Sequence, residues 1–183
     1  AAATPSTPAD PGALFAAINA DALEAAVARD VDYPVPDPAL ADRVGFIFNN
    51  LTRANLDGKL VELRRIVTPD LYPWFVTYTT VQRAAQEANQ QDVYVADVYV
   101  AVVDGWGDRA LAAAFVRSSI KYVRVILDSH AVIRTSERTL LRNLASFLGK
   151  QTLAKNKPVL QVGESGGEGG SKGGLIGVRE GAD

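Results

Sequence analysis

The residue types that most often carry chemistry are scarce in this chain. His130 is the only histidine and there is no cysteine, so a thiolate nucleophile or a zinc site built on cysteine and histidine lacks its ligands. Carboxylates lie close together at Asp92 and Asp97 and at Asp57 and Glu62, but none is embedded in an apolar stretch that would suit it for acid–base work. We expect these acids to lie on solvated helix faces and His130 to be structural. The sequence therefore favours a chain that is not an enzyme and holds no metal or cofactor.

Two short motifs match functional patterns only in part. The stretch GGEGGSKGG is similar to a phosphate-binding loop, but that loop needs GxxxxGK[ST] between a strand and a helix, whereas Lys172 is followed by Gly173. Asn50-Leu51-Thr52 matches the glycosylation sequon. Because no secretion signal accompanies it, we interpret the sequon as a chance match and expect Asn50 to hydrogen-bond within a pair of helices.

The composition is that of an ordinary globular protein. The 183 residues, 48% hydrophobic and 22% charged, suffice for one domain with its own core. The net charge of −2 lacks the basic excess of a dedicated nucleic-acid binder, so direct binding of RNA or DNA should be weak or absent. No stretch is long and apolar enough to cross a bilayer, and we expect no membrane association.

Prolines and glycines divide the chain into four parts. Residues 1–12 are proline-rich and predict a flexible arm. Residues 13–38 predict a short alanine-rich helix followed by a Pro-rich linker. Residues 39–162 are helical in pattern almost throughout and form the expected domain. Residues 163–183 hold nine of the fifteen glycines and predict a disordered tail.

Within residues 39–162, apolar side chains recur at helical spacing. One stretch, Asp92–Val103, alternates in places like a strand, but a lone strand would have no sheet to join, so we predict a helix there. The inward stripes expected for the other five helices are Leu40, Val44, Ile47, Phe48 and Leu51; Leu56, Leu60, Leu63 and Val67; Trp74, Phe75, Tyr78 and Val81; Leu111, Phe115, Ile120, Val123 and Leu127; and Leu140, Leu141, Leu144, Phe147 and Leu148.

The helix ends have recognisable residues. Gly105 and Gly107 are expected to break the helix that follows Asp92, and Pro158 to end the last one. Side chains that can accept a hydrogen bond from an early helical N–H predict the helix starts at Asn55, Thr68, Asp108 and Ser136.

The resulting pairs of helices begin near residues 39, 69 and 108, a period of about 35–40 residues. This spacing predicts an all-α fold of antiparallel helical hairpins, stacked as a HEAT-type superhelix of about three hairpins. Trp74 is expected in its core. Trp106, in a glycine-flanked loop, could fill a gap between hairpins or be an exposed anchor for a partner, and we favour packing.

Several stretches resemble one family, the large scaffold subunit of the Ccr-Not deadenylase complex, in its central domain related to the middle domain of initiation factor 4G. The last block is the most specific, because its TLAKNKP segment is not explained by helix periodicity. The similar stretches are INADALEAA (Ile18–Ala26), RVGFIFNNLT (Arg43–Thr52), KLVELRRIV (Lys59–Val67), YPWFVTY (Tyr72–Tyr78) and RTLLRNLASFLGKQTLAKNKPVL (Arg138–Leu160).

The resemblance implies a docking platform without catalysis. In that family it holds the Caf-one/Pop-two exonuclease subunit, which shortens messenger RNA poly(A) tails, together with other Ccr-Not subunits and a DEAD-box RNA helicase involved in translational repression. It implies a cytoplasmic location, with the nucleus as a further option. The family domain has about five hairpins, whereas this chain supplies three, so the end of the stack should expose an apolar face.

For partner contacts we select the polar residues of the last helix and its end. The alternative for them is structural: the asparagines would bind backbone groups between helices and the lysines would be solvated. A second hypothesis is a weak RNA-binding helical domain that uses the basic run from Lys150 to Lys157. A small helical enzyme is a third and would need a deep pocket with a buried carboxylate pair. The selected residues are Arg142, Asn143, Lys150, Lys155 and Asn156.

Overall fold

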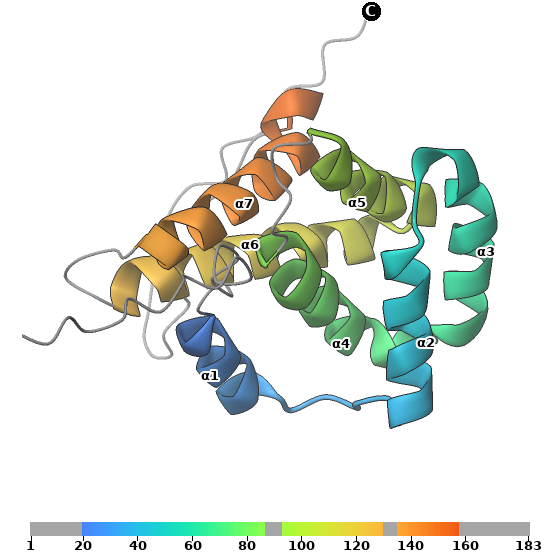
Figure 1. Cartoon of the computed structure of the whole chain (residues 1–183), viewed down its shortest axis with the longest axis horizontal. Helices are drawn as coiled ribbons and strands as arrows, with labels where there is room; N and C mark the ends of the chain where they lie inside the picture. The colour runs from blue at the N-terminus through green and yellow to red at the C-terminus, as the bar shows by residue number, and fades with distance from the viewer. Residues whose placement is uncertain (1–19, 87–92, 130–134, 158–183) are drawn as a thin grey trace, which may run out of the picture.

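The computed structural model describes residues 20–86, 93–129 and 135–157, and every regular element in these ranges is helical (Figure 1). The all-α prediction is therefore confirmed for the described part of the chain. The predicted arm, the glycine-rich tail, Asp92, His130 and Pro158 lie outside the described residues. The helices are α1 (Asp21–Asp30), α2 (Pro38–Asn49), α3 (Leu56–Ile66), α4 (Tyr72–Thr77), α5 (Val93–Trp106), α6 (Arg109–Ser129) and α7 (Thr135–Gln151), with the 3₁₀ turns η2 (Arg53–Asn55), η3 (Pro69–Leu71) and η5 (Leu153–Lys155) and the π-helix η4 (Tyr78–Ala85).

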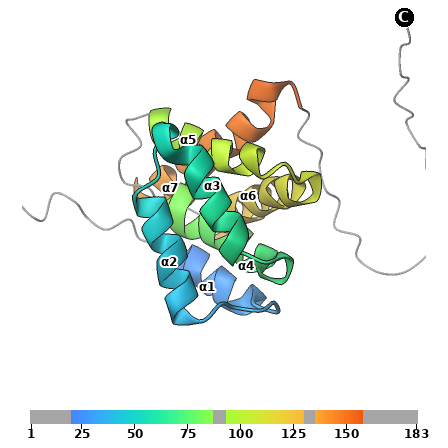
Figure 2. The same cartoon turned by 90° about the vertical axis from the view of Figure 1, so that its right-hand side faces the viewer.

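The helices stack in pairs. α2 packs on α3, α4 continues directly into η4 and returns through α5, and α6 packs on α7. Along the stack α3 contacts α5, α5 contacts α7, and α4 contacts α6. The α2–α3 pair therefore forms one end of the stack, which faces the viewer in Figure 2. This is the arrangement of stacked helical hairpins that the spacing predicted.

A line of aromatic rings joins the α4–α5 pair to the α6–α7 pair. Phe75 of α4, Phe115 of α6 and Phe147 of α7 are fully buried. Phe115 lies edge-on to both of the others, with ring centroids 6.0 Å from Phe75 and 6.3 Å from Phe147. Such edge-to-face pairs add to the stabilisation from burying the rings. The apolar stripes predicted for α2 and α3 face this core. The stripe predicted for α7 buries Leu140, Leu144 and Phe147, whereas Leu141 and Leu148 are only partly buried.

The two tryptophans differ in burial. Trp106 is 7% exposed, and its ring centroid lies 5.0 Å from that of Phe75. Its indole N–H donates to the Tyr72 hydroxyl at 3.1 Å. Trp106 therefore packs in the core, against α4 of its own hairpin, and the favoured packing role is confirmed. Trp74, expected in the core, is only half-buried and stacks on Tyr78 at its edge.

A second cluster forms where α1 covers η4, α6 and α7. Leu23 of α1 is fully buried against this surface, and Tyr122 of α6 is 2% exposed. Burial raises the pKa of Tyr122 to about 12, because the phenolate would lose its hydration. Lys121 and Asp30 form an ion pair at 2.8 Å, which fastens the end of α1 to α6.

The stripe predicted for α6 is wrong in its second half. Tyr122 and Ile126 are buried there, whereas Val123 is half-buried and Leu127 is 47% exposed. The reason is Ser119, which is buried in the stripe and donates to the Phe115 carbonyl at 2.9 Å. A serine that satisfies its hydroxyl within its own helix can lie in a core, but it interrupts the apolar pattern in the sequence.

Gly105 and Gly107 were both expected to break the helix, but only Gly107 does so. Gly105 lies inside α5, where it allows the close approach of Leu60 from α3. A β-carbon at Gly105 would collide with the Leu60 side chain. Gly107 follows the helix with φ 75°, a left-handed conformation that glycine adopts without strain, so it alone ends α5.

The four predicted helix starts differ in outcome, and one of them has the expected capping hydrogen bonds. Asp108 does cap α6, because its Oδ1 accepts from the N–H groups of Ala110 and Leu111 at 2.8 and 3.1 Å. Ser136 does not cap α7, which begins one residue earlier at Thr135. Thr68 precedes η3 but makes no side-chain capping bond. Asn55 acts by a different bond from the one predicted, described below.

Candidate functional site

The five residues selected for partner contacts do not form one free surface. Arg142 and Asn156 are exposed, and Asn156 ends η5 in the left-handed conformation with φ 54°. Lys150 and Lys155 are partly buried and Asn143 is fully buried. The described structure therefore keeps two of the five, Arg142 and Asn156, as accessible polar side chains.

Asn143 is a structural residue, and its expected exposure is wrong. Its side-chain N–H donates to the Ala85 carbonyl at 2.7 Å. Ala85 is the last residue of η4, so this bond satisfies a helix-end carbonyl that has no partner within its own helix. Asn143 lies three residues after Leu140 and four before Phe147, both buried on the core face of α7. That spacing is the one indication in the sequence that it points inward.

The two lysines fix the position of α7 and η5 against α5. Lys150 pairs with Asp97 at 2.6 Å, and Arg53 approaches the same carboxylate at 3.8 Å. Lys155 pairs with Asp104, about two helical turns further along α5. The TLAKNKP block therefore has a physical explanation after all, because Lys155 binds α5 and Asn156 closes η5. These pairs also neutralise two cations of the basic run that the RNA-binding hypothesis requires.

The described residues hold no group of three or more histidine, cysteine, aspartate or glutamate side chains that could bind a metal ion. Within the same ranges, no helix is long and apolar enough to cross a membrane. Of the acids considered for chemistry, Asp97 pairs with Lys150 and Glu62 pairs with Lys59 at 3.0 Å. Both carboxylates therefore form ion pairs with lysines.

A different surface, which we did not select from the sequence, lies on the α2–α3 pair. Phe46 of α2 is 64% exposed and Val61 of α3 is 46% exposed. Phe46 lies between the buried Val44, Ile47 and Phe48, so it falls outside the inward stripe of its helix. We use the term hairpin surface for the exposed residues Arg43, Phe46, Asn50, Val61 and Arg65.

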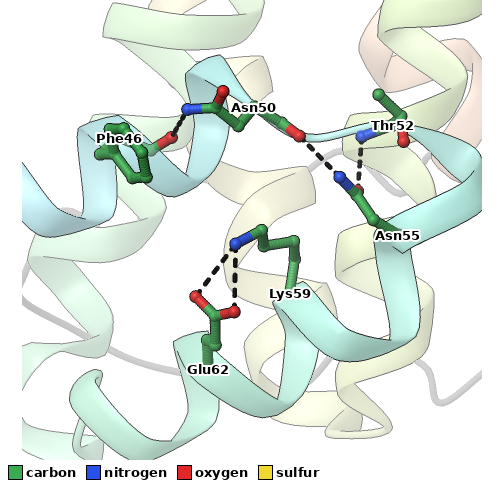
Figure 3. Close-up of polar contacts among 6 residues, drawn as sticks. All are labelled: Phe46, Asn50, Thr52, Asn55, Lys59 and Glu62. Atoms are coloured by element: carbon green, nitrogen blue, oxygen red, sulfur yellow. Dashed lines mark hydrogen bonds and ion pairs between the residues drawn. The ribbon is translucent and has the colours of Figure 1, made fainter.

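The turn beside the hairpin surface is held by local hydrogen bonds (Figure 3). The Asn50 side chain donates to the Phe46 carbonyl at 2.8 Å, and the Asn55 side chain donates to the Asn50 carbonyl at 2.8 Å. Asn55 Oδ1 accepts from the Thr52 N–H at 2.8 Å, as part of a capping box that starts η2. Asn50, the residue that follows α2, thus bonds back to that helix, and Asn55 completes the turn instead of capping α3.

The electrostatics of the hairpin surface are simple. Lys59 and Glu62 pair with each other across one turn of α3 (Figure 3). Arg83 of η4 donates to Asn49 at 2.8 Å and lies 5.6 Å from the Phe48 ring centroid. These contacts hold α2 against η4. Interface energy usually concentrates in a few aromatic and arginine side chains, and the hairpin surface exposes Phe46 together with Arg43 and Arg65.

Comparison with known proteins identifies the family to which this fold belongs. Residues 32–163 match the family model for the CCR4-NOT transcription complex subunit 1 CAF1-binding domain. The match covers more than half of the chain and includes α2–α7.

Curated relatives agree with the family model. The chain is 38% identical over 123 residues, 66% of its length, to general negative regulator of transcription subunit 1 of Saccharomyces cerevisiae. It is 30% identical over 165 residues, 88% of its length, to the Schizosaccharomyces pombe protein of the same name. It is 31% identical over 157 residues, 81% of its length, to CCR4-NOT transcription complex subunit let-711 of Caenorhabditis elegans. The matched regions span 5%, 7% and 6% of those relatives. The chain belongs to the family of CCR4-NOT subunit 1 CAF1-binding domains.

Proposed function

We propose that this chain is a non-catalytic scaffold that docks CAF1, the Caf-one/Pop-two exonuclease expected from the resemblance, for the shortening of messenger RNA poly(A) tails. The observation that carries the proposal is the match of residues 32–163 to a domain described by its binding of CAF1. The stacked helical pairs support it, because such stacks present extended surfaces to partner proteins.

The hairpin surface is the proposed contact for CAF1. Phe46 would insert into an apolar pocket of the partner, since interface energy concentrates in a few aromatic or arginine side chains. The hydrogen-bonded turn at Asn50–Asn55 keeps α2 and α3 in a fixed relation, so binding requires little ordering of this surface. The scaffold domain proposed for this role comprises residues 39–162.

Co-purification of the intact chain with recombinant CAF1 tests the proposal. Phe46→Asp should weaken binding by at least about tenfold, because a charge would replace an apolar anchor. Leu153→Asp is a matched control, since Leu153 on η5 is 67% exposed and lies outside the hairpin surface. Failure of the intact, folded chain to retain CAF1 would refute the docking function, whereas equal binding of both variants would refute only the choice of surface.

Further partners are part of the same proposal. A DEAD-box RNA helicase and other CCR4-NOT subunits would use surfaces that remain free when CAF1 is bound, and the complex would act in the cytoplasm, with the nucleus as a second compartment. Arg142 and Asn156 are the exposed members of the set selected from the sequence and are the contacts we propose for such a second partner. Alanine at both positions should reduce helicase capture while leaving CAF1 capture unchanged.

A further inference from the structure

A groove of about 540 Å³ lies between the first half of α6 and the ends of α5 and α7. Its floor is the first half of α6, and its wall is formed by the ends of α5 and α7 together with η5. The floor is apolar and made of the α6 side chains Ala112, Ala113, Val116 and Ile120. The opposite side of α6 buries Leu111 and Phe115 in the core. α6 therefore has a second apolar face that no described helix covers.

The groove also contains a buried polar atom without a partner. Gln151, at the end of α7, is 5% exposed and lines the groove. Its Nε2 donates to the Phe147 carbonyl at 3.2 Å, but its Oε1 accepts no hydrogen bond within the described residues. Buried acceptors in folded proteins are nearly always paired. An N–H group that enters the groove would supply the missing donor.

The rim of the groove is positively charged. Arg109 and Arg117 of α6 are exposed, and neither has an acidic partner among the described residues. Lys157 is exposed at the lip, whereas Lys155 is already paired with Asp104. Since these cations surround an apolar floor, the groove is complementary to a segment that carries both apolar side chains and carboxylates.

We propose that the occupant is the segment of this same chain that follows Lys157, residues 158–168. The segment starts at the lip, because Lys157 itself lines the groove. It reads PVLQVGESGGE, so apolar residues come first and Glu164 and Glu168 follow. In an extended backbone Leu160 and Val162 lie on one side, which would contact the α6 floor. A backbone N–H of the segment donates to Gln151 Oε1, and the glutamates pair with Arg109 and Arg117.

The length of the segment fits this placement. The floor from Ala112 to Ile120 spans about 12 Å along α6, from the helical rise per residue. Five extended residues, 158–162, reach at most about 17 Å, enough to follow the floor before the glycines begin. The covalent link makes the binding intramolecular, so even a weak contact is favoured by a high effective concentration.

Disulfide trapping tests this inference directly, because the chain has no cysteine of its own. The variant Val116→Cys with Leu160→Cys should form an intramolecular disulfide at least about tenfold faster than Ala25→Cys with Leu160→Cys under mild oxidation. Ala25 is an exposed alanine of α1 and does not line the groove. Non-reducing electrophoresis and mass spectrometry of the linked peptides give the rates. Equal rates for the two pairs, or disulfides mainly between two copies of the chain, would overturn the proposal.

Charge reversal provides an independent measurement in the same trapping assay. Glu164→Lys with Glu168→Lys should slow formation of the disulfide between positions 116 and 160 several-fold, and so should Arg109→Glu with Arg117→Glu. Combining all four substitutions should restore much of the rate, because opposite charges again face each other. Circular dichroism confirms that each variant is folded. Slower trapping in the combined variant than in either pair would contradict the charge pairing proposed here.

Discussion

Two regions of the helical stack, the α2–α3 end and the groove beside α6, are built differently. At the α2–α3 end, the turn closes by hydrogen bonds between residues at most five positions apart, and Phe46 is exposed beside it. Around the groove, the ion pairs from α7 and η5 to α5 join residues 51 to 53 positions apart. There Gln151 retains a buried acceptor with no partner among the described residues. We propose the first region as the contact for a partner protein and the second as the contact for residues 158–168 of the same chain.

Removing Trp106 should produce the largest effect, because it joins α5 to α4 in the middle pair of the stack. Trp106→Ala removes a ring that is 7% exposed and in contact with Phe75, and we expect a loss of about 3–5 kcal/mol in the free energy of unfolding. Urea denaturation followed by circular dichroism measures it. Trp74→Ala is the control, and its half-buried ring should cost clearly less. Equal losses would mean that the buried Trp106 contributes no more to stability than Trp74 at the edge of the core.

Replacing Asn143 and its neighbour Arg142 in turn tests which of these two polar residues of α7 stabilises the fold. Asn143→Ala leaves the Ala85 carbonyl without its donor and should cost about 1–3 kcal/mol of stability. The neighbouring Arg142→Ala should change stability by less than about 0.5 kcal/mol, since Arg142 is exposed. The pair can be compared by thermal melting. A destabilised Arg142 variant beside an unaffected Asn143 variant would contradict the assignment.

Alanine substitutions at two glycines compare a tightly packed position with an open one. Gly105 of α5 packs against α3, whereas Gly58 of α3 faces open space. A methyl group at Gly105 would collide with Leu60, and we expect Gly105→Ala to cost about 1 kcal/mol, the cost of overpacking less the gain in helix propensity. Gly58 has no atom within 4 Å of the same added carbon, so Gly58→Ala should stabilise by about 0.5–1 kcal/mol. Chemical denaturation gives both values. Stabilisation by both changes would show that α3 and α5 are not tightly packed at Gly105.

The lysine pairs should have the smallest effect. Lys150→Ala and Lys155→Ala each remove a partly exposed ion pair and should cost about 0.2–1 kcal/mol at low salt. The cost should shrink in about 0.5 M salt, because added ions screen the charges. Unfolding midpoints at two salt concentrations measure this. A loss that is large and independent of salt would indicate that the lysine stems, and not their charges, hold α7 and η5 against α5.

Much of the fold follows from the sequence, since the stripes of α2, α3 and α7 repeat at helical spacing and each buries one face. The helix at Asp92–Val103 was predicted correctly on the argument that a single strand has no partner, although α5 as described begins at Val93. The second half of α6 was not, because Ser119 satisfies its hydroxyl inside the core and breaks the apolar pattern. A pattern of residue types cannot show that a polar group is satisfied.

The candidate surfaces were harder to predict for the same reason. Asn143, Lys150 and Lys155 are polar by type, but their partners are 51 to 58 residues away and only the folded chain brings them together. Phe46 has the opposite character, since an apolar residue among buried neighbours is easily assigned to the core. Its position outside the stripe of Val44, Ile47 and Phe48 was the available indication.

Hydrogen exchange with and without CAF1 tests the central claim most directly, because it compares both regions of the stack in one experiment. The account predicts that saturating CAF1 slows exchange of backbone amides in Arg43–Asn50 and Leu56–Arg65, on the hairpin surface. Amides of Arg138–Gln151 and of η5 should exchange at unchanged rates. Protection confined to α7 and η5, with α2 and α3 unaffected, would contradict the assignment of CAF1 docking to the α2–α3 end.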